Sequence, residues 1–224
     1  MSAKDHSLSG KHPKQDFQVE RIAFFSDAVF AIAITLLVIE FRAPHVTKET
    51  TEQGLWEEVA AMKYKLMSVI LSFSLVVNYW IRHHTLFKHI HNYNKKIIVA
   101  NMLTLIPIIF FPFTTSFLYE SLGVNNAAAA VPYRLFLINN ILAGVMMYYF
   151  YWLLMKKYKE MSYPMEKEDN REFEGKLIVM TLSFTLVVII SIFSTEKSIW
   201  GLLPFGLYNF FNRFSNKKKI TKHA

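Results

Sequence analysis

The chain of 224 residues is 53% hydrophobic and only 19% charged, whereas soluble domains carry roughly 25% charged residues. It has no Cys and only 7 Gly and 7 Pro, which excludes disulfide frameworks, thiolate metal sites and collagen-like or low-complexity chains. The apolar residues gather into runs long enough to cross a bilayer. The sequence therefore predicts an all-α integral membrane protein.

Residues 1–20 are polar and lack the apolar core of a signal peptide, so we expect a cytosolic N-terminal tail. Six transmembrane helices are predicted to follow, at about 22–41, 66–81, 97–118, 132–154, 177–193 and 199–211. The sixth segment is shorter than the ~17 residues that usually cross a bilayer, so we expect it to be tilted, partly interfacial or extended. This organisation gives a single six-span repeat over residues 21–214 and a basic cytosolic C-terminal tail at 215–224.

Basic residues separate by membrane side. If six segments cross, all but six of the 25 Lys and Arg residues lie on the side of the termini, the exceptions being Arg42, Lys48, Lys63, Lys65, Arg134 and Lys197. Cytoplasmic loops are enriched in Lys and Arg, so this distribution favours six spans with both termini in the cytoplasm. Membrane topology and contact with anionic lipids then account for the net charge of +8. No nucleic acid partner is needed to explain it.

Signals of enzymatic chemistry are missing. The sequence contains no Gly-rich phosphate loop, no H-E-x-x-H and no G-x-S-x-G, and predicted spans two to six contain no Asp or Glu for a proton relay. Four histidines follow the second span among basic residues that would repel a cation: His83, His84, His89 and His91. We therefore expect no enzyme activity, no cofactor and no metal site.

The first span differs from the others because it contains an acid. Asp27 lies six positions inside its start, about 9 Å along the helix axis. Burying a carboxylate there costs ~2.5 to 3.5 kcal/mol, so an acid at this depth suggests a functional residue. An Asp that is hydrogen-bonded and only fixes helix packing is an equally open interpretation.

An apolar stripe runs along the same span, on a face away from the acid. At about 100° per residue, its four members fall within about 60° of one another, namely Phe25, Ile32, Leu36 and Ile39. Asp27 points roughly 140° away from Ile32. Because the helix is apolar nearly all round, ordinary packing or lipid contact also accounts for the stripe.

The start of the span has a recognisable pattern. It reads Arg21, three residues, then Phe25-Ser26-Asp27, followed by AVFAIAITLLVIEF. This pattern resembles the R-x-x-x-F-S-D signature of the transmembrane-protein-175 potassium channels. The similarity extends to Trp80-x-x-x-His84, Asn101 and Pro107.

The resemblance implies a homotetramer in which the first span of each subunit lines a central pore. It implies that Ile32, Leu36 and Ile39 form apolar rings that close the pore, and that Thr35 forms a polar layer that influences cation preference. It also implies a packing network behind the pore, made of Arg21, Phe25, Ser26, Asp27, Trp80, His84 and Asn101. A single repeat resembles the bacterial and archaeal members, which implies a multi-pass protein of the plasma membrane.

The predicted function is a passive potassium-permeable cation channel with a hydrophobic gate, and its partners are further copies of the chain, the lipid bilayer and potassium ions. The sequence lacks a T-V-G-Y-G filter, so potassium selectivity of that strong kind is not expected. One alternative is a small secondary transporter, for which broken helices are typical, as Pro107 and Pro112 suggest. A non-conducting membrane scaffold is the other.

Overall fold

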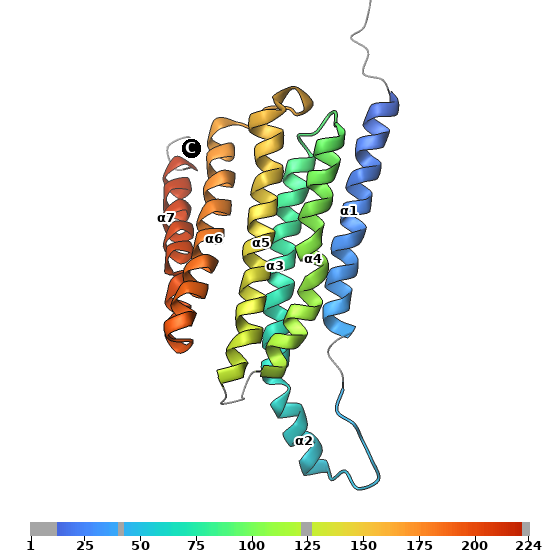
Figure 1. The fold of residues 1–224 in the computed structure, drawn as a ribbon, viewed down its shortest axis with the longest axis vertical. Helices are drawn as coiled ribbons and strands as arrows, with labels where there is room; N and C mark the ends of the chain where they lie inside the picture. The colour runs from blue at the N-terminus through green and yellow to red at the C-terminus, as the bar shows by residue number, and fades with distance from the viewer. Residues whose placement is uncertain (1–12, 40–42, 122–126, 221–224) are drawn as a thin grey trace, which may run out of the picture.

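The computed structural model describes residues 13–39, 43–121 and 127–220. Long helices run up and down side by side, with α4 and α5 in the middle and α1 and α7 on opposite sides (Figure 1). The α-helices are α1 (Pro13–Ile39), α2 (Glu52–Ala61), α3 (Lys63–Phe87), α4 (Lys95–Ser121), α5 (Ala130–Trp152), α6 (Lys167–Phe193) and α7 (Leu203–Ile220). Shorter turns lie at η1 (Ala127–Ala129), η2 (Leu153–Lys157), η3 (Lys159–Met161) and η4 (Glu196–Leu202), and η2 is π-helical.

Five of the described helical segments are long and apolar enough to cross a membrane. The predicted all-α fold is confirmed, and the chain is a multi-pass membrane protein. The predicted sixth span corresponds to η4 and α7, which runs back beside α6 (Figure 1). Helix α7 carries three consecutive lysines at 217–219. Over its whole length it is therefore too polar to count among the five membrane-spanning segments.

Several helices extend beyond their apolar parts. α6 begins at Lys167, ten residues before the predicted start at 177, and α1 begins at Pro13, inside the expected polar tail. Charged residues such as Lys and Glu are good helix formers, so hydropathy marks the membrane-buried part of a helix and not its ends. Helix α2 falls in a segment where no helix was expected, and none of its residues is buried.

Helix α4 is continuous although it contains Pro107 and Pro112. Each proline removes one backbone donor and disturbs the helical hydrogen bonds. The side chain of Asn139 on α5 donates from Nδ2 to the carbonyl oxygen of Pro107 at 3.0 Å. The carbonyls that lose their helical donors are those of Leu103 and Ile108, so this hydrogen bond does not replace a lost one but joins α4 to α5 beside Pro107. Because α4 runs unbroken from Lys95 to Ser121, the prolines do not divide it into half-helices, which removes the feature that favoured a transporter.

The loop before α7 packs very closely on α6. A Cβ atom at Gly201 in η4 would lie 2.6 Å from the backbone nitrogen of Val187 on α6. Real Cβ atoms do not approach so closely, and backbone atoms have little freedom to move away. Only glycine fits at this point of contact.

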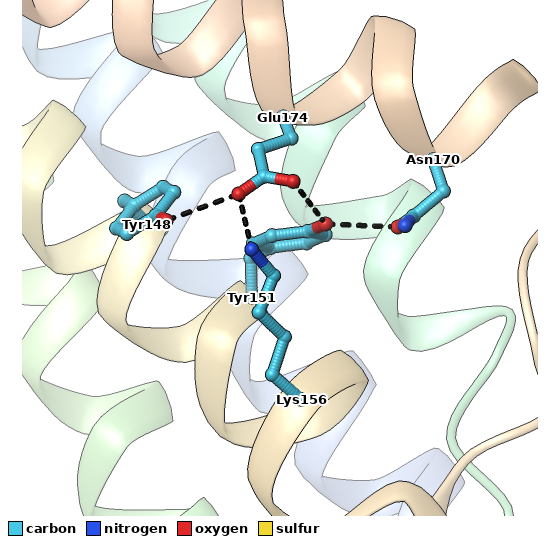
Figure 2. A network of polar contacts seen from close by, with 5 residues as sticks. All are labelled: Tyr148, Tyr151, Lys156, Asn170 and Glu174. Carbon is cyan, nitrogen blue, oxygen red and sulfur yellow. Dashed lines mark hydrogen bonds and ion pairs between the residues drawn. The ribbon is translucent and has the colours of Figure 1, made fainter. Parts of the chain in front are cut away.

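Polar side chains join α5 to α6 at the end of the bundle where α1 begins and α7 ends, which we call the tail end (Figure 1). Glu174 on α6 accepts a hydrogen bond from the Tyr148 hydroxyl at 3.1 Å and forms an ion pair with Lys156 (Figure 2). The Tyr151 hydroxyl lies 2.9 Å from Asn170 Oδ1 and 3.2 Å from Glu174 Oε2. These contacts fix the charged start of α6 against α5.

Candidate functional site

Helix α1 packs against α3 and α4 through one face. Its buried side chains recur every three or four residues, which is the spacing of a single helical stripe: Ser26, Phe30, Ala33 and Leu37. All four are almost fully inaccessible to solvent. This buried face holds α1 on the bundle, whereas the side chains of another face are exposed.

The opposite face of α1 carries the apolar stripe. Ile32 is 57% exposed and Ile39 is 67% exposed, while Phe25 and Leu36 on the same side are exposed as well. Thr35 is exposed beside them, and its hydroxyl donates to the Ile32 carbonyl oxygen at 2.9 Å. None of these side chains belongs to the buried core of the single chain, so in a membrane they face lipid, a pore or another subunit.

Asp27 is hydrogen-bonded to α3. Trp80 donates from Nε1 to Asp27 Oδ1 at 2.9 Å. The ring of Trp80 stacks on that of His84 with centroids 5.4 Å apart. The carboxylate thus faces a neighbouring helix of its own chain, as the packing interpretation requires, and it lies off the stripe that contains Ile32.

A second polar group lies fully buried between α1, α3 and α4. Asn101 donates from Nδ2 to Ser26 Oγ at 2.9 Å, and Ser26 Oγ donates to the Ile22 carbonyl at 2.9 Å. His83 Nε2 lies 2.7 Å from Asn101 Oδ1. Since this amide oxygen only accepts, Nε2 of His83 carries the hydrogen. The group connects three helices without any charged side chain.

Two expected members of the network lie elsewhere. Arg21 and Phe25 are exposed and line a shallow cavity of about 340 Å³ beside Tyr93. Within the described part of the chain, no hydrogen bond or ion pair joins Arg21 to Asp27 or Asn101. In a single chain, the structure therefore brings together Ser26, Asp27, Trp80, His84 and Asn101 but not the first two motif residues.

His83 was missed as a site residue. Its neighbour His84 was expected in the network, yet His83 makes the hydrogen bond to Asn101 and contacts the Phe30 ring at 5.4 Å between centroids. Helical spacing could have identified it, because Val76, Tyr79, His83 and Leu86 form one buried stripe on α3. Within the described residues, no three potential metal ligands lie close enough together to hold an ion.

Comparisons with known proteins point to one family. The family model described as endosomal/lysosomal potassium channel TMEM175 matches residues 21–112. A protein of Streptomyces collinus named as a potassium channel is 32% identical over 55% of this chain and 59% of its own length. A second, from Chamaesiphon minutus, is 36% identical over 49% of this chain and 53% of its own length. The chain thus spans somewhat more than half the length of these curated relatives.

A solved structure has a similar fold over most of the chain. The crystal structure of a TMEM175 homologue from Chamaesiphon minutus, described as a lysosomal potassium-selective channel homologue, superposes with a TM-score of 0.68. The match covers 89% of this chain and 99% of that one at 23% identity, which establishes a common fold. Residues 21–112 are thus similar in sequence to the TMEM175 potassium channels, and the chain shares its fold with a solved TMEM175 homologue.

Proposed function

We propose that the protein is a passive potassium-permeable cation channel in the plasma membrane of a bacterium or archaeon. The division of α1 into two faces carries this proposal. One face is buried through Ser26 and its neighbours, and the other presents Ile32, Leu36 and Ile39 outside the fold of the single chain. The names of the matching relatives support potassium as the permeant ion.

The proposed pore requires several copies of the chain. Only one helix per chain carries the R-x-x-x-F-S-D pattern, and one helix cannot enclose a pore. We therefore propose a homotetramer of single six-span repeats over residues 21–214, with the tails 1–20 and 215–224 in the cytoplasm. Four copies of α1 would turn their exposed apolar stripes toward a common axis.

The gate would be an apolar constriction. Four Ile32 side chains converging on the axis exclude water, and a potassium ion there loses hydration without any carbonyl or carboxylate to replace it. Leu36 and Ile39, one and two turns further along, add wider apolar rings. Thr35 supplies hydroxyls next to the narrowest ring and would contribute to cation preference.

Recordings from the purified protein in planar bilayers test this function. The proposal requires unitary potassium currents, whose ion flux far exceeds the turnover of a transporter, and a reversal potential that follows the potassium gradient. Protein-free bilayers are the control. A slow, saturating flux without unitary events would identify a transporter, and the absence of any flux in tetrameric protein would leave a scaffold.

A further inference from the structure

A cavity separate from α1 lies in the tail-end half of the bundle, between α3, α6 and α7. Its volume is about 460 Å³. Apolar side chains form part of its wall, contributed by Ile81, Phe173 and Phe205 from the three helices. Polar and charged side chains form the remainder, so the cavity is suited to a ligand with both kinds of surface.

The charged group inside this cavity is Arg82. Its side chain is nearly buried, with 8% of the residue exposed, and its Nε donates to Asn78 Oδ1 at 2.9 Å. Within the described residues, no carboxylate forms an ion pair with it. A guanidinium has five N–H donors, and a buried charge without a counterion is costly. The two terminal nitrogens of Arg82 are therefore suited to the oxygens of a phosphate, which guanidinium binds in a bidentate manner.

The cavity lining also contains an exposed carboxylate, that of Asp169. This carboxylate forms no hydrogen bond or ion pair with any other residue the structure describes. The two remaining charged residues of the lining, Glu172 and Lys176, pair with each other. The lining thus contains equal numbers of basic and acidic side chains. A ligand with both a negative and a positive group therefore suits the cavity better than a simple anion.

Arg82 and Asp169 lie at different distances from the tail end, and this difference determines how the ligand is oriented in the cavity. Asp169 lies in the first turn of α6, whereas Arg82 lies five residues before the end of α3, about 7.5 Å inward. The start of α6 and the end of α3 both lie at the tail end (Figure 1). In a phospholipid with an amine headgroup, the phosphate likewise lies deeper in the bilayer than the terminal amine.

We propose that this cavity binds the headgroup of an aminophospholipid of the phosphatidylethanolamine type. Its phosphate accepts hydrogen bonds from Arg82, and its primary ammonium donates to Asp169. Its glycerol and acyl groups follow the apolar wall past Phe173 and Phe205. This inference does not depend on ion conduction, because it concerns helices other than α1.

Native mass spectrometry of the full chain with added lipids tests the proposal. Delipidated protein receives equal amounts of phosphatidylethanolamine, phosphatidylcholine and phosphatidylglycerol, and we expect adducts of phosphatidylethanolamine to dominate. Phosphatidylglycerol lacks the ammonium, and the choline headgroup has no N–H to donate. Asp169→Asn should lower the ratio of phosphatidylethanolamine to phosphatidylglycerol adducts several-fold, while Arg82→Gln should reduce both. Glu160→Gln also replaces a carboxylate by an amide, but at an exposed residue outside the cavity lining. It should leave the ratio unchanged.

Three results would overturn the proposal. The first is an unchanged lipid preference in Asp169→Asn, which decides the matter even if Arg82→Gln does not fold, because Asp169 is exposed. The second is equal binding of the three lipids by the parent protein. The third is loss of the phosphatidylethanolamine adducts when millimolar inorganic phosphate is added, which would assign the cavity to free phosphate.

Discussion

Helices α1 and α4 are both 27 residues long and strongly apolar, yet they are buried to different degrees. The mean hydropathy of the most apolar stretch is 2.5 in α1 and 2.1 in α4. Within the chain, 56% of that stretch is buried in α4 but only 22% in α1. The more apolar of the two helices is therefore the less buried one.

The comparison shows that apolar content does not indicate which membrane helix forms the core. Lipid is as apolar as a side chain of Leu, so hydrophobicity gives no preference for protein over lipid. Buried polar residues are better markers: Asn101 and Thr104 lie on α4 and Ser26 lies on α1, and each is turned toward other helices. The long exposed face of α1 is then available for contacts between subunits or for a pore.

Substitution of the exposed face should have the largest effect. Ile32→Asn places an amide at the proposed constriction, so water persists there and the closed pore should leak. We expect basal current at least several-fold above the parent at equal surface expression, with weaker discrimination between cations. Ile32→Leu keeps the volume and the apolar character, and it should remain mostly closed. Whole-cell or bilayer recording gives both quantities.

The matched control is Val38→Asn on the same helix. Val38 is 64% exposed, like Ile32, but points about 120° away from it. We expect its basal current to stay near that of the parent. If Ile32→Asn channels conduct no more than the parent, or if Val38→Asn channels leak equally, the stripe does not form the gate.

Substitution of Asp27, which is hydrogen-bonded to α3, should act on assembly and not on selectivity. Asp27→Asn weakens the hydrogen bond from Trp80, and bonds to charged groups contribute about 1.5 to 3 kcal/mol. We expect a lower yield of assembled protein in size-exclusion chromatography and an unchanged reversal potential. Trp80→Phe removes the donor but keeps an aromatic ring beside His84, so it should show the same pattern. Normal assembly with a shifted reversal potential would place Asp27 in the ion path.

The contact that supports α4 should have a smaller effect. Asn139→Leu removes the hydrogen bond to the Pro107 carbonyl while approximately keeping the side-chain volume. Hydrogen bonds between membrane helices contribute about 0.6 kcal/mol on average. A loss of that order in thermal or denaturant unfolding, without a change in conductance, is the expected result. A strong change in conductance would instead indicate that α4 bends during gating.

The smallest effect is expected at the tail end. Lys156→Met removes an ion pair with Glu174 whose partners are partly exposed, and such pairs contribute about 0 to 1 kcal/mol. Tyr148 and Tyr151 both donate hydrogen bonds to Glu174 in the parent protein, and we expect the variant to keep them (Figure 2). The unfolding midpoint should hardly move. A large decrease would mean that Lys156, and not the tyrosines, fixes α6 to α5.

Much of the fold follows from the sequence because runs of apolar residues identify membrane helices directly. The predicted segments 66–81 and 97–118 lie inside α3 and α4, each within a few residues of its ends except at the C-terminal end of α3. Helix α2 could not be predicted in the same way. It is short, none of its residues is buried, and its apolar residues do not form a run of membrane-spanning length.

The site was only partly predictable. The spacing within α1 separates Asp27 from Ile32, because helix geometry fixes relative direction within one helix. On α3, the spacing of Val76, Tyr79 and Leu86 indicates His83, but the resemblance pointed to His84, and here His83 rather than His84 contacts Asn101. The exposed positions of Arg21 and Phe25 could not be predicted either, because the spacing within one helix does not show which neighbouring segments pack against its start.

The close contact at Gly201 has a consequence for the divergence of this chain. Because no side chain fits against the Val187 backbone, shape fixes the start of α7 on α6, independently of how apolar α7 is. Substitutions along the outer surface of α7 can then accumulate without displacing the helix. A replacement of the single glycine, however conservative, would shift the whole hairpin formed by α6 and α7. We therefore expect relatives to vary widely in α7 while retaining glycine at its entrance.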